Sequence, residues 1–272
     1  MRRLRRERGA IARAFERARK EKRAAFVPFL MAGDPDLATT TDLVVALAEA
    51  GADVVELGVP FSDPMADGPV NQAAAERALA AGTTLERILA TVASLRARTD
   101  VAIVLFSYFN PIHRYGVARL AEHAAASGVD GILCVDLPPD EAQGDYLDAL
   151  RTHALDPIFL LAPTSTRERV RAVARVASGF VYYVSRTGVT GERAELPRDL
   201  AKEVTALRKA LKLPVAVGFG ISTPQQAAAV ARIADGVVVG SALVRLAAES
   251  RKPAEAVRRT GRSLRASMLR VR

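Results

Sequence analysis

The sequence is poor in the residues and segments that mark several protein classes. Cys134 is its only cysteine, so no disulfide can form within the chain, and its apolar neighbours predict a buried strand position rather than a reactive thiol. No stretch approaches the roughly 18 uncharged apolar residues of a membrane-spanning helix, and the arginine-rich start lacks the apolar core of a secretory signal. We therefore expect a folded cytoplasmic protein that does not enter a membrane.

Motifs for metal binding and for two common kinds of hydrolysis are also missing. The three histidines, His113, His123 and His153, are scattered, and no spacing would assemble a zinc site with Cys134. There is no Gly-x-Ser-x-Gly elbow and no phosphate-binding loop ending in Gly-Lys-Ser/Thr. The sequence thus predicts no metal and does not favour a serine hydrolase or a nucleoside triphosphatase.

Positive charge is abundant, but it is concentrated at the two ends. The formal net charge is +9, of which residues 1–23 carry +8 and residues 251–272 carry +7, which leaves −6 for residues 24–250. Leu4, Ile11 and Phe15 fall on one helical face, so residues 1–23 are predicted to form an amphipathic helix docked on the body with its arginines in water. The basic ends therefore do not predict a nucleic-acid site, and residues 251–272 are expected to form a helix or a tail.

Residues 24–250 show the pattern of repeated βα units. Short apolar runs that are too hydrophobic on both faces for a half-exposed sheet alternate with longer stretches of helical spacing. The predicted strands are 25–31, 54–57, 102–106, 131–135, 157–161, 180–185, 215–217 and 236–239. The predicted helices are 37–50, 83–98, 116–127, 139–153, 166–177, 197–211, 223–234 and 241–249, with Thr or Pro near several starts.

Eight such units without a linker predict one structural domain, an α/β fold consisting of a single (β/α)8 TIM barrel with an extra N-terminal helix. A doubly wound α/β fold is the alternative, and it would require a Gly-x-Gly-x-x-Gly turn after an early strand. The first strand here ends in Met-Ala-Gly-Asp-Pro instead. In such barrels the chemistry lies at the carboxyl ends of the strands, so polar residues there are the candidates for function.

The segment around the second strand contains two candidate catalytic carboxylates. Glu56 lies inside an apolar strand, where an anion is costly to bury, so it either finds a positively charged partner or has a raised pKa suited to acid–base catalysis. Asp67 follows eleven residues later on a loop with three prolines and can face the same pocket, or it can simply cap a turn. Asp63, beside Pro64, is interpreted as such a turn residue.

Glycine-rich turns after the seventh and eighth strands predict a phosphate site. Residues 218–222 and the pair Gly240 and Ser241 would let backbone N–H groups approach an anion, and a helix starting at Ser241 would point its positive end at a phosphate. Glycines also occur at such turns for steric reasons alone. The two turns together are the stronger signal because barrels commonly hold phosphate at this place.

Two further segments have candidate substrate contacts. Tyr182 and Tyr183 alternate in the sixth strand, so only one can point into the barrel, and the glycines of the loop after it suggest a lid, although an ordinary flexible loop would have the same composition. Phe29, in the first strand, can form an apolar wall for a flat ligand or can serve core packing only.

Taken together, these segments closely resemble the signature segments of tryptophan synthase α subunits over residues 11–249. The most specific is the string Glu-Leu-Gly-x-Pro-x-Ser-Asp-Pro-x-Ala-Asp-Gly-Pro that begins at Glu56. Met31, where the family usually has Thr, and the basic ends are departures. The matching segments are 28–35, 56–64, 66–69, 185–191 and 218–222.

The resemblance implies a lyase that cleaves indole-3-glycerol phosphate, by a retro-aldol reaction, into indole and glyceraldehyde 3-phosphate. Glu56 would then be the acid–base residue, and Asp67 would hold the indole N–H and stabilise the positive charge that develops on the ring. The family pattern implies substrate contacts by Phe29 in the indole pocket, Tyr182 beside Glu56, Thr190 near Asp67 when the loop closes, Phe219, and Gly191, Gly220, Gly240 and Ser241 at the phosphate.

The resemblance also implies a partner. The family α subunit works in an α2β2 heterotetramer with a β subunit that carries pyridoxal phosphate and receives the indole, so this chain itself would need no cofactor. Asp63, Pro64 and residues 107–111 match regions near that interface. Three alternatives remain: a free-standing lyase of the same fold, a catalytically silent scaffold, against which the intact Glu56 and Asp67 argue, and nucleic-acid binding by the basic ends.

Overall fold

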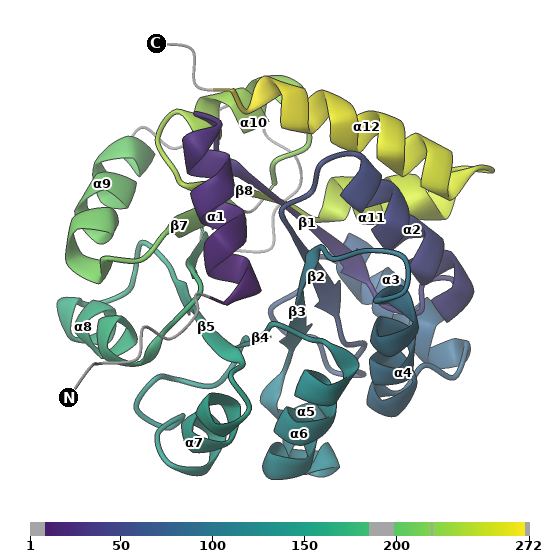
Figure 1. Ribbon diagram of the computed structural model, residues 1–272, viewed down its shortest axis with the longest axis horizontal. Helices are drawn as coiled ribbons and strands as arrows, with labels where there is room; N and C mark the ends of the chain where they lie inside the picture. Colours follow the sequence, from purple (N-terminus) through teal and green to yellow (C-terminus); the bar gives the residue numbers. More distant parts are fainter. Residues whose placement is uncertain (1–8, 185–198, 219, 270–272) are drawn as a thin grey trace.

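The computed structural model describes residues 9–184, 199–218 and 220–269, which form a closed barrel of eight parallel strands in chain order (Figure 1). β8 pairs with β1, with Pro28 opposite Val239, and this pairing closes the ring. The predicted barrel is thereby confirmed. The strands are β1 (Ala25–Met31), β2 (Val54–Gly58), β3 (Ala102–Ser107), β4 (Gly131–Cys134), β5 (Asp156–Leu161), β6 (Val181–Val184), β7 (Val215–Gly218) and β8 (Gly236–Val239).

Helices surround the barrel and cover the outer faces of the strands (Figure 1). Several begin as the sequence predicts: Thr84, Thr166 and Thr223 each accept a hydrogen bond from a backbone N–H in the first turn. The described helices are α1 (Ala10–Lys20), α2 (Leu37–Glu49), α3 (Pro69–Ala80), α4 (Leu85–Leu95), α5 (Phe109–Tyr115), α6 (Val117–Ser127), α7 (Asp145–Thr152), α8 (Arg167–Val176), α9 (Leu200–Leu211), α10 (Pro224–Ala231), α11 (Ser241–Glu249) and α12 (Pro253–Ser267).

Several helices have somewhat shorter bounds than predicted, and three differ most. α3 and α5 were not predicted, and α7 is shorter than the predicted 139–153. α3 is rich in alanine and has no distinct apolar stripe, so its periodicity is weak, although Pro69 at its first position is a common helix start. α7 begins only after Gly144, whose φ of 82° is a left-handed conformation that a helix interior does not accept.

α1 closes the barrel at the amino-terminal ends of the strands. Ile11 and Phe15 are buried as predicted, and they pack with side chains that fill the barrel interior, including Phe180, whose ring centroid is 5.4 Å from that of Phe15. Leu4, predicted on the same face, lies outside the described residues. Figure 1 shows α1 lying across the ring of strands. Because this end is plugged, the opposite end is the one where a substrate can enter.

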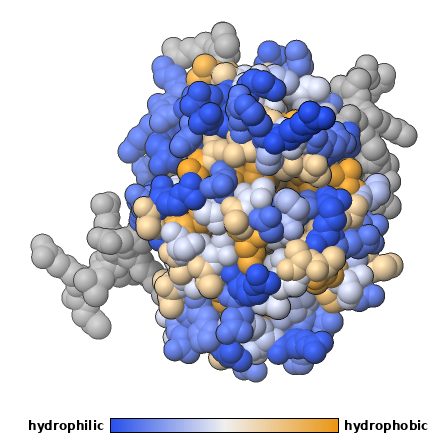
Figure 2. Space-filling model, turned by 90° about the vertical axis from the view of Figure 1, so that its right-hand side faces the viewer, coloured by the Kyte–Doolittle hydropathy of each residue, from blue (hydrophilic) through white to orange (hydrophobic). Residues whose placement is uncertain are grey.

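α12 packs against α2 of the first unit and against α10 and α11 of the final units. Val257 and Leu264 are buried on its inner side, whereas Arg259 and Arg262 are exposed. The face of the molecule that includes α12 is largely hydrophilic, with hydrophobic residues gathered in a band across its upper half (Figure 2). Within the described ranges, no single helix is long and apolar enough to cross a membrane.

Candidate active site

Glu56 points into the barrel because of the alternation along β2. Val54 belongs to the side chains that fill the interior, whereas Val55 and Leu57 pack under the outer helices, so Glu56 shares the inner face with Val54. Its side chain is 0% exposed, and neither carboxylate oxygen has a hydrogen-bond partner among the described residues. The alternative of a buried ion pair therefore finds no support in the described part of the chain.

Burial without a partner makes Glu56 a weak acid. Removing the carboxylate from water penalises its charged form and raises the pKa of Glu56 to about 8. At neutral pH the side chain is therefore mostly protonated. It can give a proton to a bound ligand and take one back.

Asp67 lies on the loop between β2 and α3, half-buried, and a side chain from another segment holds its carboxylate. The Tyr108 hydroxyl donates to Asp67 Oδ2 over 2.9 Å. Burial raises the pKa of Asp67, and the polar side chains of Tyr108 and Asn71 oppose that rise. Gln72 Nε2 donates to the Asp67 backbone oxygen over 2.9 Å, which anchors the loop as well.

Tyr182 lies near both carboxyl groups, those of Glu56 and Asp67. It belongs to the interior cluster, whereas Tyr183 packs outward and donates to Glu203 over 2.8 Å, so the prediction that only one of the pair points inward is confirmed. Burial raises the pKa of Tyr182 well above its ordinary value, and the charges of Glu56 and Asp67 act in the same direction. The three groups are therefore close enough to influence one another electrostatically.

Aromatic rings line the interior beside these groups. The ring of Phe106 lies edge-on to Phe29, with centroids 5.3 Å apart, and its centroid is 6.5 Å from that of Tyr182. Phe106 was not among the predicted site residues, although its alternation with Val104 in β3 places it on the inner face. The result is an apolar wall suited to a flat aromatic ligand.

The turn after β8 places glycine and a helix start next to that wall. α11 begins at Ser241 with Gly240 as its N-cap, and a Cβ on Gly240 would lie 3.6 Å from the Phe29 Cβ. Gly220, after β7, has a φ of 78°, and a Cβ there would meet no atom within 4 Å. The first N–H groups of a helix have no partner inside the helix, so this turn can receive an anion. Thr190, Gly191 and Phe219 lie outside the described residues.

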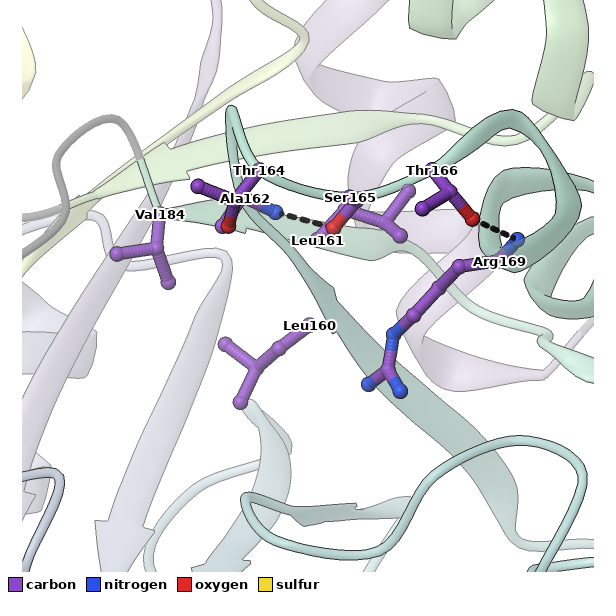
Figure 3. Close-up of a pocket in the computed structure, with 8 residues that line it drawn as sticks. All are labelled: Leu160, Leu161, Ala162, Thr164, Ser165, Thr166, Arg169 and Val184. Atoms are coloured by element: carbon purple, nitrogen blue, oxygen red, sulfur yellow. Dashed lines mark hydrogen bonds between the residues drawn. The ribbon is translucent and has the colours of Figure 1, made fainter.

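A cleft of about 340 Å³ opens at the carboxyl ends of β5 and β6 (Figure 3). The described lining of this cleft includes neither Glu56 nor Asp67, so the cleft does not contain the site. It adjoins the site, because its lining residues Leu160 and Val184 pack against the interior cluster that contains Tyr182. The guanidinium of Arg169 extends into it. The lining residues are Leu160, Leu161, Ala162, Thr164, Ser165, Thr166, Arg169 and Val184.

Among the described residues, no group of three or more His, Cys, Asp and Glu side chains could hold a metal ion. Cys134, predicted to be buried in a strand, is buried at the end of β4. Besides Phe106, the site residue whose role the sequence did not show is Tyr108. It lies in the segment 107–111 that the resemblance placed near the partner interface, but nothing local shows that it meets Asp67.

Comparison with known proteins agrees with this geometry. The family model described as tryptophan synthase alpha chain matches residues 15–268. The tryptophan synthase alpha chain of Geobacter sulfurreducens is 58% identical over 236 residues, 87% of this chain and 89% of the relative, and that of Geotalea daltonii is 56% identical over 237 residues, with the same coverage.

Solved structures give the same result. Mycobacterium tuberculosis tryptophan synthase has a chain that superimposes with a TM-score of 0.90 at 38% identity, covering 97% of this chain and 100% of that one. Tryptophan synthase subunit alpha from Legionella pneumophila gives a TM-score of 0.89 at 37% identity, covering 96% and 99%. The barrel, the acidic pair at its open end and this likeness along nearly the whole chain together mean that the protein belongs to the tryptophan synthase alpha chain family.

Proposed function

We propose that Glu56 and Asp67 are the residues by which this chain cleaves indole-3-glycerol phosphate into indole and glyceraldehyde 3-phosphate, the lyase reaction of its family. The observation that carries the proposal is the state of Glu56: a fully buried carboxyl group without a described partner, in the same chamber as a second carboxyl group. Such a group is unfavourable for stability and useful for proton transfer.

Glu56 acts as the acid and the base. The carbon–carbon bond to the indole ring breaks only when the ring carbon has been protonated, because the ring then becomes a leaving group. With a pKa near 8, Glu56 carries that proton at neutral pH. The resulting carboxylate accepts the proton of the adjacent glycerol hydroxyl as the aldehyde forms, which returns Glu56 to its starting state.

Asp67 accepts a hydrogen bond from the indole N–H and stabilises the positive charge that protonation places on the ring. Phe29 and Tyr182 contact the substrate from the apolar wall. Gly220 after β7, together with Gly240 and Ser241 at the start of α11, binds its phosphate. The roles of Thr190, Gly191 and Phe219 stay predictions from the sequence.

The test is steady-state cleavage by Glu56→Gln and Asp67→Asn, with the exposed Glu86→Gln as the charge-matched control. Glu56→Gln should lower kcat by about 10²- to 10⁴-fold while substrate binding stays measurable, because acid–base catalysis is worth about that much. Asp67→Asn should lower kcat/KM by about tenfold or more, and Glu86→Gln should match the wild type. Activity of Glu56→Gln near that of the wild type would refute the mechanism.

We also propose that the chain works with a β subunit that carries pyridoxal phosphate, in an α2β2 heterotetramer. The family assignment supports this, and so does the surface beside the site: Asp63 is exposed, and Met65, two residues later, is 88% exposed, which is unusual for a large apolar side chain. The cytoplasmic location expected from the sequence stays a prediction.

Indole release measured with and without an added tryptophan synthase β subunit tests the partner. Slow release by the chain alone and much faster release with the partner are expected. Fast release by the chain alone would favour the free-standing lyase, and no release in either mixture would favour the silent scaffold.

A further inference from the structure

We propose that Gln72 is a positioning residue for the reaction: its side-chain amide holds the backbone of Asp67 and thereby sets the direction in which the Asp67 carboxylate faces the substrate. Gln72 lies near the start of α3. The inference rests on the proposed role of Asp67. It adds to the acidic pair a residue that acts through Asp67 and does not itself touch the substrate.

The backbone that carries Asp67 forms a tight turn between β2 and α3. The Asp67 N–H donates to the Pro64 carbonyl oxygen over 3.0 Å, and the Met65 N–H donates to the Asp63 carbonyl oxygen over 2.9 Å. Residues 63–67 lie outside any strand or helix, so the hydrogen-bond ladders of the barrel and of α3 do not fix this turn. Contacts with side chains therefore decide where Asp67 lies.

The Gln72 amide joins both ends of this turn to α3. Its Nε2 donates to the Asp67 carbonyl oxygen over 2.9 Å and, more weakly, to the Pro64 carbonyl oxygen over 3.5 Å. An amide nitrogen carries two protons, so one side chain can serve both acceptors. Asp67 and Pro64 are also the residues whose N–H and C=O groups close the turn, so Gln72 holds the turn as one unit.

α3 is a firm anchor for this amide. The alanines on its inner side are buried in the core. Arg77 of the same helix donates to both carboxylate oxygens of the buried Asp34, over 2.7 and 2.8 Å. A group held by a packed helix is placed more precisely than a group on a loop alone. The position of the Asp67 backbone therefore follows the position of α3.

Tyr108 and Gln72 hold different parts of Asp67. The Tyr108 hydroxyl donates to Asp67 Oδ2 over 2.9 Å, so it determines how the carboxylate is rotated. Gln72 binds the main chain, so it determines the point about which the carboxylate rotates. A displacement of about 1 Å can cost on the order of 10²-fold in rate. The Gln72 amide therefore supports the charge stabilisation that Asp67 provides.

Gln72→Met tests the inference, because methionine has a similar length but no donor. We expect kcat/KM to fall about tenfold, mainly through kcat, because Asp67 acts on a charge that develops only in the transition state. The melting temperature should fall by no more than a few degrees, since one partly buried hydrogen-bonding group is lost. Gln143→Met, at an exposed glutamine before α7, is the matched control and should equal the wild type in both measurements.

Gln72→Glu separates hydrogen-bond donation from the filling of space. Glutamate has nearly the shape of glutamine, but its ionised form has no proton to donate and faces two carbonyl oxygens. At about pH 8, kcat/KM should therefore decrease in the order wild type, Gln72→Met, Gln72→Glu. Toward about pH 5 the new carboxyl group gains a proton and can donate, so the activity of Gln72→Glu relative to Gln72→Met should rise. Wild-type activity of Gln72→Glu at pH 8, or a ratio that does not change with pH, would overturn the inference.

The double variant Gln72→Met with Asp67→Asn separates a positioning role from a general disturbance. With Asp67 already changed, replacing Gln72 should have almost no further effect on kcat/KM. A tenfold further loss in that background, or wild-type activity of Gln72→Met while Asp67→Asn is impaired, would overturn this inference and leave the proposed function standing. Wild-type activity of Asp67→Asn would overturn the role of Asp67 and this inference with it.

Discussion

At the scale of the residue, Glu56 combines two effects that oppose each other. Its burial destabilises the fold at neutral pH, because the unfolded chain ionises this carboxyl group near its ordinary pKa of 4.5, while the folded protein holds it protonated up to about pH 8. The same shift provides the proton that cleavage needs. The residue is thus retained for its chemistry at the expense of stability.

This conflict predicts a pH-dependent stability difference between the wild type and Glu56→Gln. The folded protein binds the proton of Glu56 more tightly than the unfolded chain does. This difference contributes fully to stability below pH 4.5, and the contribution is lost as the pH rises toward 8. Relative to the wild type, Glu56→Gln should therefore gain stability by up to about 1.4 kcal/mol for each pH unit within that window. Urea unfolding of both proteins at several pH values between 5 and 8 measures this, and a difference that does not change with pH would contradict it.

At the scale of the element, glycines at the carboxyl ends of the strands make room for the aromatic wall. A Cβ on Gly58 would lie 2.6 Å from Phe29 Cζ, and a Cβ on Gly218 would collide with the Tyr182 hydroxyl. Parallel strands bring the ends of β1 and β2 side by side, with Met31 opposite Gly58. The glycine at the end of one strand therefore determines how closely a ring from its neighbour can approach.

Gly58→Ala should impair substrate binding more than it impairs the fold. The new methyl group must push the Phe29 ring out of its place beside the indole pocket, so we expect KM to rise severalfold, with a loss of about 1–3 kcal/mol in stability from overpacking. Gly68→Ala is the matched control, because its φ is −76° and its Cβ would meet no atom within 4 Å. An unchanged KM in Gly58→Ala would show that Phe29 does not line the substrate pocket.

At the scale of the whole molecule, the segment after α1 meets the end of α12 at the closed end of the barrel. Arg23 and Asp53 form a buried ion pair, 3% and 1% exposed, and Asp53 also accepts from Arg17 of α1 over 3.1 Å and from the Phe26 backbone N–H over 2.9 Å. Glu21 accepts from Arg265 of α12 over 2.9 Å. This network joins α1, β1, β2 and α12 on the side away from the candidate site.

Asp53→Asn should therefore destabilise the protein without changing its chemistry. Arg23 would keep its contact with the partly exposed Glu21 Oε2, at 2.7 Å, but would lose its buried charge partner, which costs up to about 3–5 kcal/mol. The exposed pair of Asp42 and Arg98 is the control, since Asp42→Asn should change stability by less than about 1 kcal/mol. Urea unfolding tests the difference, and kcat of the folded Asp53→Asn variant should equal that of the wild type. Equal destabilisation by the two substitutions would contradict this account.

Much of this could be predicted from the sequence because the signals are local. Eight alternations of apolar runs and helical stretches predicted the barrel, since side-chain period and burial are properties of a few neighbouring residues. Glu56 was recognisable as an acidic residue in an apolar strand, and the inward direction of one of the two adjacent tyrosines followed from strand alternation. α3 was missed because its small side chains produce no apolar stripe, and its stability comes from packing Ala74, Ala75 and Ala78 against Phe29 and Val244.

By itself, the sequence determined the barrel, the polar strand ends and the family resemblance. Only the tertiary structure decided whether Glu56 has a partner in the described chain, because an ion pair depends on residues distant in sequence. It also decided what holds Asp67, because Tyr108 follows the neighbouring strand β3, 41 residues further along the chain. Whether two side chains meet depends on how all eight units close into a ring, and no local pattern contains that information.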